Sequence, residues 1–344
     1  MKELFLTVKP MKKLLPLLLA ILLAGCGASN DEKHTKSVFA MDTYITLTSY
    51  GGTDKALEAA SDKLTELESL WSVTDSGSEI YKANHSGGST VTFSDETAEL
   101  VCFALDMYKK TDGALDISIY PLLAEWGFTT SDYHVPSQDR IDSLLKAVDA
   151  KRVDISGNSI TVPNGMMIDL GSVAKGRAAD LAADVLKDKG ITSALLDLGG
   201  NIRTIGTKPD GSLWKIGLRD PNREGTLGTV TVGETSVVTS GGYERFFIED
   251  GKTYWHILDP KTGYPADSGI ISSTVIGNDG ALCDALSTSL FILGADKAAE
   301  LYKTIGGFEY ILLNNDGELL VSAGIADSFS LSQGRNDLKV TVVK

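Results

Sequence analysis

The sequence predicts a mixed α/β fold with α+β sheets for the part of the chain that follows a short N-terminal leader. Strand and helix patterns alternate between residues 166 and 198, and short strand patterns separated by turn signals follow between 201 and 276. Hydrophobic residues make up 42% of the chain. That share is enough to build a large core in one domain or in two closely packed lobes.

The first 25 residues have the layout of a secretory signal peptide. Lys12 and Lys13 precede an apolar run over 14–24, which is shorter than the ~20 residues that span a bilayer. The run ends in Leu-Ala-Gly before Cys26 and resembles the bacterial lipobox, whether the chain starts at Met1 or at Met11. We therefore expect cleavage before Cys26 and a lipid on that residue, which would hold the protein on the extracytoplasmic face of the cell membrane.

Residues 26–37 comprise the lipidated cysteine and a predicted flexible tether, because they show no apolar periodicity. Residues 38–344 form the predicted folded body. Its first half is expected to contain a strand over 39–50 and helices over 56–71, 94–113 and 139–148. Thr53 or Asp54 would cap the first helix, and acidic residues after Ser94 suit the first turn of the second.

The second half of the body continues the alternation. We expect a strand over 166–170, a helix over 172–189, a strand over 194–198, short strands within 201–276, a helix over 280–293, and a final small helix with strands. Glycine-rich turns at 199–200 and 241–242 are interpreted as tight turns. Cys102 and Cys283 lie in apolar helical patterns and are predicted to be core residues outside any disulfide framework.

The charge of the chain argues against one class of partner. Its formal net charge is -14, from 46 acidic and 32 basic residues. No basic patch is visible in the sequence, so a nucleic acid recognised through its phosphates would be repelled.

The segment from 168 to 176 could bind a phosphate. Asp169 ends an apolar run, a Gly-Ser turn follows, and Lys175 falls in the first turn of the predicted helix. Free amides at a helix start favour an anion, but neither the P-loop nor the dinucleotide-binding pattern is met. An ordinary connection, with Ser172 as N-cap and Lys175 in solvent, remains the alternative.

Two further segments could carry chemistry. Asp284 and Thr288 are one helical turn apart, and a carboxylate with a hydroxyl suits Mg²⁺; the alternative is a solvated aspartate and a half-buried threonine. The scattered histidines and cysteines do not have the spacing of a zinc site. His256 precedes a Pro-Lys-Thr-Gly turn and is either structural or a general base.

Taken together, the ordered motifs resemble the bacterial flavin transferase family, the FAD:protein FMN transferases once linked to thiamine biosynthesis lipoproteins. The resemblance covers the body from Phe39 onward. It is carried by the segments 41–43, 113–128, 169–176, 198–201, 256–263 and 284–288.

The resemblance implies a flavin transferase fold with tunnelling-fold-like character, in which two lobes surround an FAD cleft. Mg²⁺ would be held by Asp284, Thr288 and the backbone carbonyl of Ser172. The implied contacts with FAD come from Met41, Thr74, Ala114, Leu115, Asp116, Asp169, Lys175 and Leu258. The chain departs from the family pattern at Asp42, where glycine is common, and at Ser287, where some relatives have an acidic residue.

The implied reaction moves FMN from FAD to a Thr or Ser hydroxyl of an acceptor protein and releases AMP. His256, or alternatively Asp284, would accept the hydroxyl proton. The expected partners are extracytoplasmic redox proteins that carry a Ser/Thr-Gly-Ala-Ser/Thr motif. A metal-dependent FAD pyrophosphatase, a lipoprotein that only binds flavin and a general solute-binding lipoprotein are the alternatives; the second would not need Asp284 or Thr288.

Overall fold

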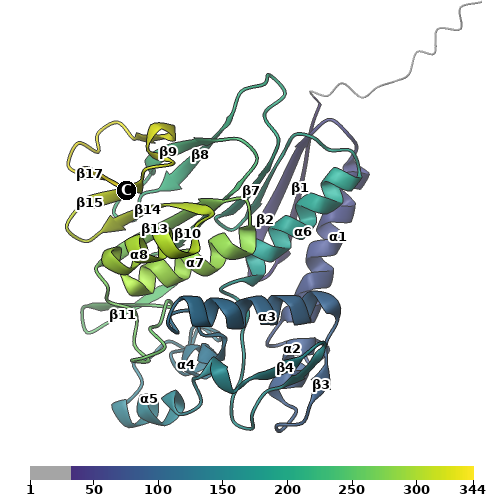
Figure 1. The fold of residues 1–344 in the computed structure, drawn as a ribbon, viewed down its shortest axis with the longest axis vertical. Coiled ribbons are helices and arrows are strands. Elements are labelled where there is room, and N and C mark those ends of the chain that lie inside the picture. Colours follow the sequence, from purple (N-terminus) through teal and green to yellow (C-terminus); the bar gives the residue numbers. More distant parts are fainter. Residues whose placement is uncertain (1–31) are drawn as a thin grey trace, which may run out of the picture.

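A nine-stranded sheet runs through the middle of the protein (Figure 1). The computed structural model describes residues 32–344, so the predicted signal peptide and Cys26 lie outside the described residues. Neighbouring strands are antiparallel except for the last pair, which is parallel. Their order across the sheet is β1 (Lys33–Ala40), β2 (Thr43–Tyr50), β6 (Ala194–Leu198), β7 (Asn201–Ile205), β10 (Ser236–Gly241), β13 (Ile270–Gly277), β14 (Phe308–Asn314), β15 (Glu318–Ser322) and β17 (Lys339–Val343).

Both faces of the central strands are covered. Leu57 and Leu64 of the first helix and Leu286 of the seventh are buried in the core on one face. On the other face, Val237 and Ile276 pack with Trp214 of a three-stranded sheet. The helices of the first layer are α1 (Asp54–Trp71), α6 (Ala174–Asp188), α7 (Gly280–Leu293) and α8 (Ala295–Ile305), and the small sheet contains β8 (Trp214–Arg219), β9 (Thr226–Val232) and β16 (Phe329–Leu331), which follows η3 (Ala326–Ser328).

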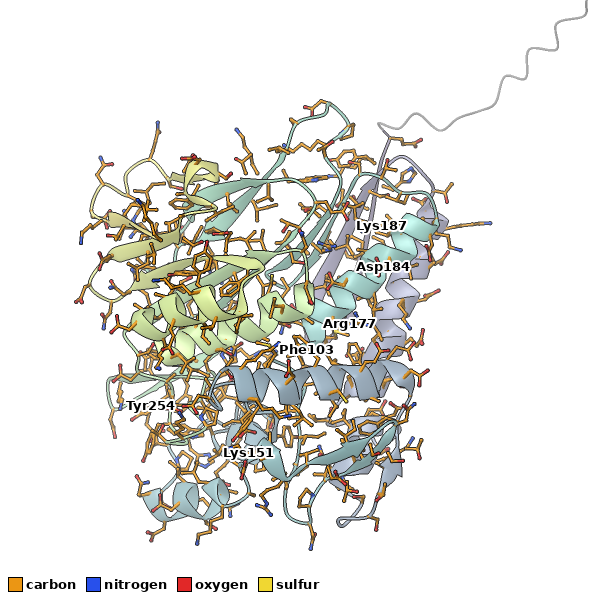
Figure 2. All side chains as sticks on the ribbon, in the orientation of Figure 1. Phe103, Lys151, Arg177, Asp184, Lys187 and Tyr254 are labelled. Atoms are coloured by element: carbon orange, nitrogen blue, oxygen red, sulfur yellow. The ribbon has the colours of Figure 1, made fainter. Side chains whose placement is uncertain are left out.

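A second lobe lies below the helix layer in Figure 1. Side chains fill the space between the two lobes, and Phe103 packs against the main core (Figure 2). The lobe contains α2 (Glu79–Asn84), α3 (Asp95–Lys110), η1 (Ile117–Ile119), α4 (Tyr120–Glu125), α5 (Gln138–Leu145), η2 (Ala150–Arg152) and a sheet of β3 (Val91–Thr92), β4 (Asp154–Ser156) and β5 (Ser159–Thr161). A hairpin of β11 (Phe246–Glu249) and β12 (Lys252–Trp255) packs beside it. The predicted mixed α/β architecture is therefore confirmed.

The start of the body differs from the prediction. The strand predicted over 39–50 is the hairpin of β1 and β2, which turns at Met41 and Asp42 with φ of 53° and 57°. The sheet begins at Lys33, so the last part of the predicted tether, 33–37, belongs to β1. It shows no apolar periodicity because β1 is an edge strand whose polar side chains are exposed or half-buried, while its backbone pairs with β2.

Two other predictions are wrong. The segment 166–170 forms no strand, because the Asn84 side chain bonds both the amide and the carbonyl of Ile168, at 2.7 and 2.8 Å. Cys102 is exposed although it lies on α3, whereas Cys283 is buried as expected. Among residues 32–344, no helix is long and apolar enough to cross a membrane.

Candidate active site

Two hairpin turns meet at one end of the large sheet. The turn at Met41 and Asp42 is fixed to α1, since the Met41 amide donates to Glu68 Oε1 at 2.9 Å. The turn that contains Gly199 packs so closely that a Cβ there would lie 2.1 Å from Thr43 Oγ1. Both residues of the first turn have positive φ, which explains why glycine would suit position 42.

The predicted phosphate-binding segment is placed directly beside this end of the sheet. The Asp169 amide donates to Ile117 O at 2.7 Å, and Asp169 Oδ1 accepts from the Gly171 amide at 2.6 Å. Lys175 Nζ donates to Gly171 O at 3.2 Å. Burial raises the pKa of Asp169, which the charge of Lys175 opposes and that of Asp42 reinforces. These three side chains therefore share one charged environment.

Ser172 is not the N-cap of the following helix, since α6 begins at Ala174 after Val173. In a continued helix the Gly176 amide would meet the carbonyl of Ser172, but it donates to Asp284 Oδ2 of α7 at 2.9 Å instead. The simple connection considered from the sequence is therefore wrong at Ser172. The structure thus brings Asp284 of α7 into contact with Gly176, which is far from it in sequence and four residues after Ser172.

The close contact of α6 with α7 depends on two glycines. A Cβ on Gly176 would lie 2.0 Å from Gly280 O and 2.8 Å from Asp284 Cβ, so neither helix could keep its place. A second bond supports the contact, because the Gly280 amide donates to Asp180 Oδ2 at 2.7 Å. Asp180 in turn faces Arg203 of β7 at 3.2 Å. The first turn of α7 is thus fixed against α6 and the sheet.

The oxygen atoms at this contact fit a hard divalent cation. Asp284 is only 3% exposed, and it makes no ion pair within the described residues, so its buried carboxylate lacks a balancing charge. Thr288 Oγ1 lies 3.2 Å from Ser240 Oγ, and Ser287 Oγ donates to Asp284 O at 2.9 Å. Across residues 32–344, no group of three or more His, Cys, Asp or Glu side chains is arranged to hold a metal. A site with one carboxylate and neutral oxygens suits Mg²⁺ rather than zinc.

His256 is held through its backbone amide and one ring nitrogen. Its amide and Nδ1 lie 3.1 and 3.2 Å from Arg245 O, so Nδ1–H donates to this carbonyl and Nε2 keeps its lone pair. Burial, together with the smaller effects of the charges of Arg245 and Lys175, lowers the pKa of His256 to about 4. The imidazole is therefore neutral at pH 7 and can accept a proton at Nε2.

The remaining predicted ligand-binding residues differ in what they can offer. Ala114 and Leu115 are buried, so a ligand could meet only their backbone. The Asp116 carboxylate accepts from Ser118 and from the Ala150 amide, which commits it to holding the loop before η1. Leu258 is buried in the core of the second lobe, and Thr74 is exposed in the loop after α1.

The sequence did not indicate Arg245, which is important for the charge of the site. Arg245 is exposed, and within the described residues neither it nor Lys175 forms an ion pair with a carboxylate. Its charge nevertheless acts on both Asp169 and His256. Its position shortly after the Gly241–Gly242 turn is the feature of the sequence that could have indicated a role in the site. Two cations without carboxylate partners beside a neutral histidine can bind an anionic substrate such as a pyrophosphate.

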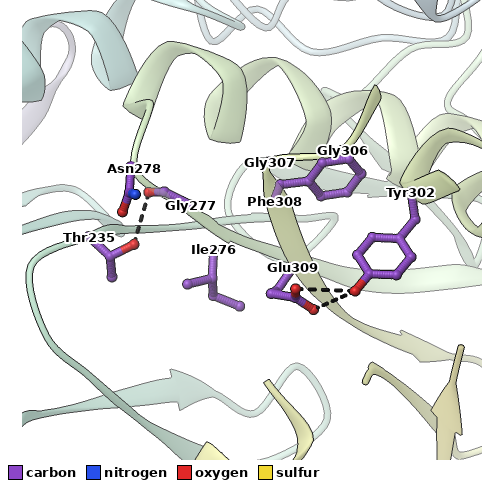
Figure 3. Close-up of a pocket in the computed structure, with 9 residues that line it drawn as sticks. All are labelled: Thr235, Ile276, Gly277, Asn278, Tyr302, Gly306, Gly307, Phe308 and Glu309. Atoms are coloured by element: carbon purple, nitrogen blue, oxygen red, sulfur yellow. Dashed lines mark hydrogen bonds between the residues drawn. The ribbon is translucent and has the colours of Figure 1, made fainter. Parts of the chain in front are cut away.

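A separate pocket lies at the opposite end of the large sheet (Figure 3). Three of its polar side chains are already bonded within the protein: Glu309 accepts from Tyr302 Oη at 2.9 Å, and Thr235 Oγ1 donates to Gly277 O at 2.9 Å. This pocket therefore offers no reactive group comparable to those of the candidate site.

Comparisons with known proteins support the same assignment. The sequence pattern of the ApbE family matches residues 41–312. The FAD:protein FMN transferase of Klebsiella pneumoniae is 31% identical over 301 residues, which cover 86% of this chain and 93% of that protein. The FAD:protein FMN transferase of Treponema pallidum is 32% identical over 299 residues, which cover 81% of this chain and 83% of that protein.

Solved structures show the same fold. The ApbE protein of Thermotoga maritima superposes with a TM-score of 0.81 at 31% identity, over 86% of this chain and 99% of that one. The apo form of the flavinyl transferase ApbE of Pseudomonas stutzeri gives a TM-score of 0.74 at 27% identity, over 90% and 97% of the two chains.

Proposed function

The chain belongs to the ApbE family, and from this premise we propose how it carries out FMN transfer from FAD to protein. The predicted enzyme class and flavin transferase fold are confirmed by the relatives and by the solved structures. The finer statements, namely a Thr or Ser hydroxyl as acceptor, AMP as the leaving group and Mg²⁺ as the cofactor, are our proposals. The observation that best supports these proposals is the bond from the Gly176 amide to Asp284, which lies beside the cations Lys175 and Arg245 and the neutral His256.

Substrate binding is proposed to depend on Lys175 and Arg245. The protein carries a net charge of -14, so the two phosphates of FAD need local positive charge. These two side chains supply it, and neither is committed to a carboxylate within residues 32–344. Met41 and Asp169 would position the rest of the substrate from the neighbouring turns.

Mg²⁺ would be held by the Asp284 carboxylate, the Thr288 hydroxyl and the Ser172 carbonyl, and when bound it supplies charge that stabilises the phosphoryl oxygens. The residues of this chain prepare the site by keeping these oxygens together. Asp284 is oriented by the Gly176 amide, and Ser240 orients Thr288.

In the proposed reaction the acceptor hydroxyl oxygen attacks the phosphorus on the FMN side of FAD. The new oxygen–phosphorus bond forms as the bond from that phosphorus to the bridging oxygen breaks, and AMP leaves with the bridging oxygen and its electron pair. His256 Nε2 accepts the hydroxyl proton, and Arg245 O keeps the ring in the required tautomer. FMN then remains as a phosphoester of the acceptor.

The place of action is also a proposal. Lipidation of Cys26 would anchor the enzyme on the extracytoplasmic face of the membrane, where its acceptors would be redox proteins with the Ser/Thr-Gly-Ala-Ser/Thr motif. The lipobox and the preceding apolar run support this assignment. Mass spectrometry of the protein purified from membranes tests it, because a diacylglyceryl group on Cys26 is expected and an unmodified cysteine would contradict it.

The transfer is tested by intact-mass analysis of a peptide with a Ser-Gly-Ala-Thr core. The peptide is incubated with the chain from Gly27 onward, which keeps all of β1, together with FAD and Mg²⁺. A single FMN adduct that disappears with EDTA is the expected result. Free FMN and AMP without an adduct would instead identify an FAD pyrophosphatase, and intact bound FAD would identify a flavin-binding protein.

A further inference from the structure

The hairpin of β11 and β12 has one packed face and one exposed face. Phe247 and Tyr254 pair across the strands and pack on Trp126, with ring centroids 6.3 and 5.3 Å away. Figure 2 shows Tyr254 of this hairpin beside the second lobe. On the opposite face, Phe246 is 45% and Ile248 is 64% exposed. These two side chains form an exposed apolar patch on β11 that can contact a partner.

The exposed face continues into the candidate active site. Phe246 pairs with Trp255, whose ring lies 6.0 Å from that of Phe291 on α7 in an edge-on arrangement. Phe291 is three residues after Thr288, on the helix that carries the proposed metal ligands. Arg245 immediately precedes β11 and His256 immediately follows β12. The His256 ring lies on the packed side of the hairpin, 6.3 Å from that of Phe128. A segment on the exposed face would therefore reach His256 by passing the end of the hairpin, a few residues further on, since a strand rises about 3.3 Å per residue.

We propose that this face is the docking surface for the acceptor protein. It is made of the exposed Phe246, Ile248 and Thr253 and of Trp255, which is half-buried against the main core, and is called here the hairpin face. The inference rests on the proposed function, which requires a polypeptide hydroxyl to reach His256. The occupant is an extended acceptor segment with apolar side chains at alternating positions on one side of the modified Ser or Thr. Within residues 32–344, β11 and β12 pair only with each other, so their outer edges can also bond a third strand.

Two observations favour an acceptor segment over a lipid surface. The described chain begins at β1, on the opposite side of the molecule from β11 (Figure 1). The proposed lipid on Cys26 lies only seven residues before Lys33, the first residue of β1, and would therefore hold that opposite side towards the membrane. The hairpin face is left free for a protein partner.

The test compares a double variant with a matched control. Phe246→Thr with Ile248→Thr removes the apolar side chains and keeps residues that favour strands. Val340→Thr with Val342→Thr makes a similar change on β17, where these valines are 45% and 49% exposed. Both proteins and the wild type are given two 20-residue peptides with a Ser-Gly-Ala-Thr core, one flanked by alternating leucines and the other by serines at the same positions.

The wild type and the control are expected to show a KM roughly tenfold lower for the leucine peptide, because burial of exposed apolar surface favours binding. The hairpin variant should lose this preference, with kcat at saturating peptide and the Kd for FAD within about twofold of the wild type. An unchanged preference in the hairpin variant, or an equal loss in the control, would overturn the proposal. A weakened Kd for FAD would assign the surface to the flavin, and a specific loss of binding to phosphatidylglycerol vesicles would assign it to the membrane.

The proposed function can fail separately from this surface. Complete absence of FMN adduct with the wild type on either peptide, while FAD is still cleaved to FMN and AMP, would refute acceptor transfer and with it the need for a docking surface. An adduct on both peptides at equal KM in the wild type would leave the transferase intact and refute only the role of the hairpin face.

Discussion

Replacing Gly176 with alanine would force α6 and α7 apart at the point where the proposed metal ligands meet. The new Cβ would lie 2.0 Å from Gly280 O, whereas real Cβ atoms essentially never come closer than 3.0 Å to another heavy atom. This carbonyl must therefore move by about 1 Å or more. The bond from the Gly176 amide to Asp284 Oδ2, now 2.9 Å, would break or lengthen with that movement. Asp284 would then lose the bond that orients its carboxylate.

The size of the effect follows from two costs. Overpacking of this kind costs about 1–3 kcal/mol, and loss of a hydrogen bond to a charged acceptor costs about 1.5–3 kcal/mol. Alanine stabilises a helix by about 1 kcal/mol relative to glycine, and this gain offsets part of the two costs. We expect the free energy of unfolding to fall by about 3 kcal/mol. FMN transfer should fall by about 100-fold, since a displacement of this size in a catalytic group has that effect.

Urea unfolding measures the first quantity, and intact-mass kinetics with the acceptor peptide measure the second. Gly233→Ala is the control, because a Cβ there would meet only Leu213 Cδ2 at an ordinary 3.8 Å. A Gly176→Ala protein that is as stable as the wild type and transfers FMN within twofold of its rate would contradict the close-approach explanation.

Three further changes test other parts of the site. His256→Gln should slow transfer by about 100-fold or more. Because the pKa of His256 is lowered to about 4, the imidazole of the wild type gains its proton only near pH 4. We therefore expect kcat/KM for FAD to stay level from pH 7 down to about 5, and an acid midpoint near 6.5 would contradict the assignment. Asp42→Gly should raise the free energy of unfolding in urea by about 0.5 kcal/mol, because position 42 has φ of 57°, and a decrease would show that the turn is not strained. Asp180→Ala should lower it by about 3 kcal/mol, because Arg203 would lose the carboxylate 3.2 Å away, and an unchanged value would show that the pair contributes nothing.

The sequence is most informative where one helix covers the main core. Apolar residues recur at the helical period over 56–71, and the observed α1 is Asp54–Trp71; the helix predicted over 280–293 is likewise observed as α7. Extended segments are harder, because their identity depends on distant partners. The apolar run before Asp169 looks like a strand, yet the Asn84 side chain takes its backbone bonds. The turn at Met41 lacks the Asn-Gly pair that signals a hairpin.

The site shows the same division between local and distant information. The spacing of Asp284 and Thr288 correctly places both on one helix, because one turn separates them. Nothing in either local segment shows that the Gly176 amide meets Asp284, since that bond joins residues 108 positions apart. The role of Arg245 is hidden for a similar reason, because its carbonyl fixes His256 only after the β11–β12 hairpin has formed.

The charges of the site are better explained as an arrangement for the substrate than for the free protein. Arg245 and Lys175 both lower the pKa of His256, and neither has a carboxylate partner within the described chain. In the free protein burial, and to a smaller extent these cations, make the imidazole a weak base. The phosphates of bound FAD would offset them, and the pKa of His256 would then rise towards the pH at which a proton can be accepted efficiently. Substrate binding would thus both fill the site and strengthen its base, which the separate residues could not do.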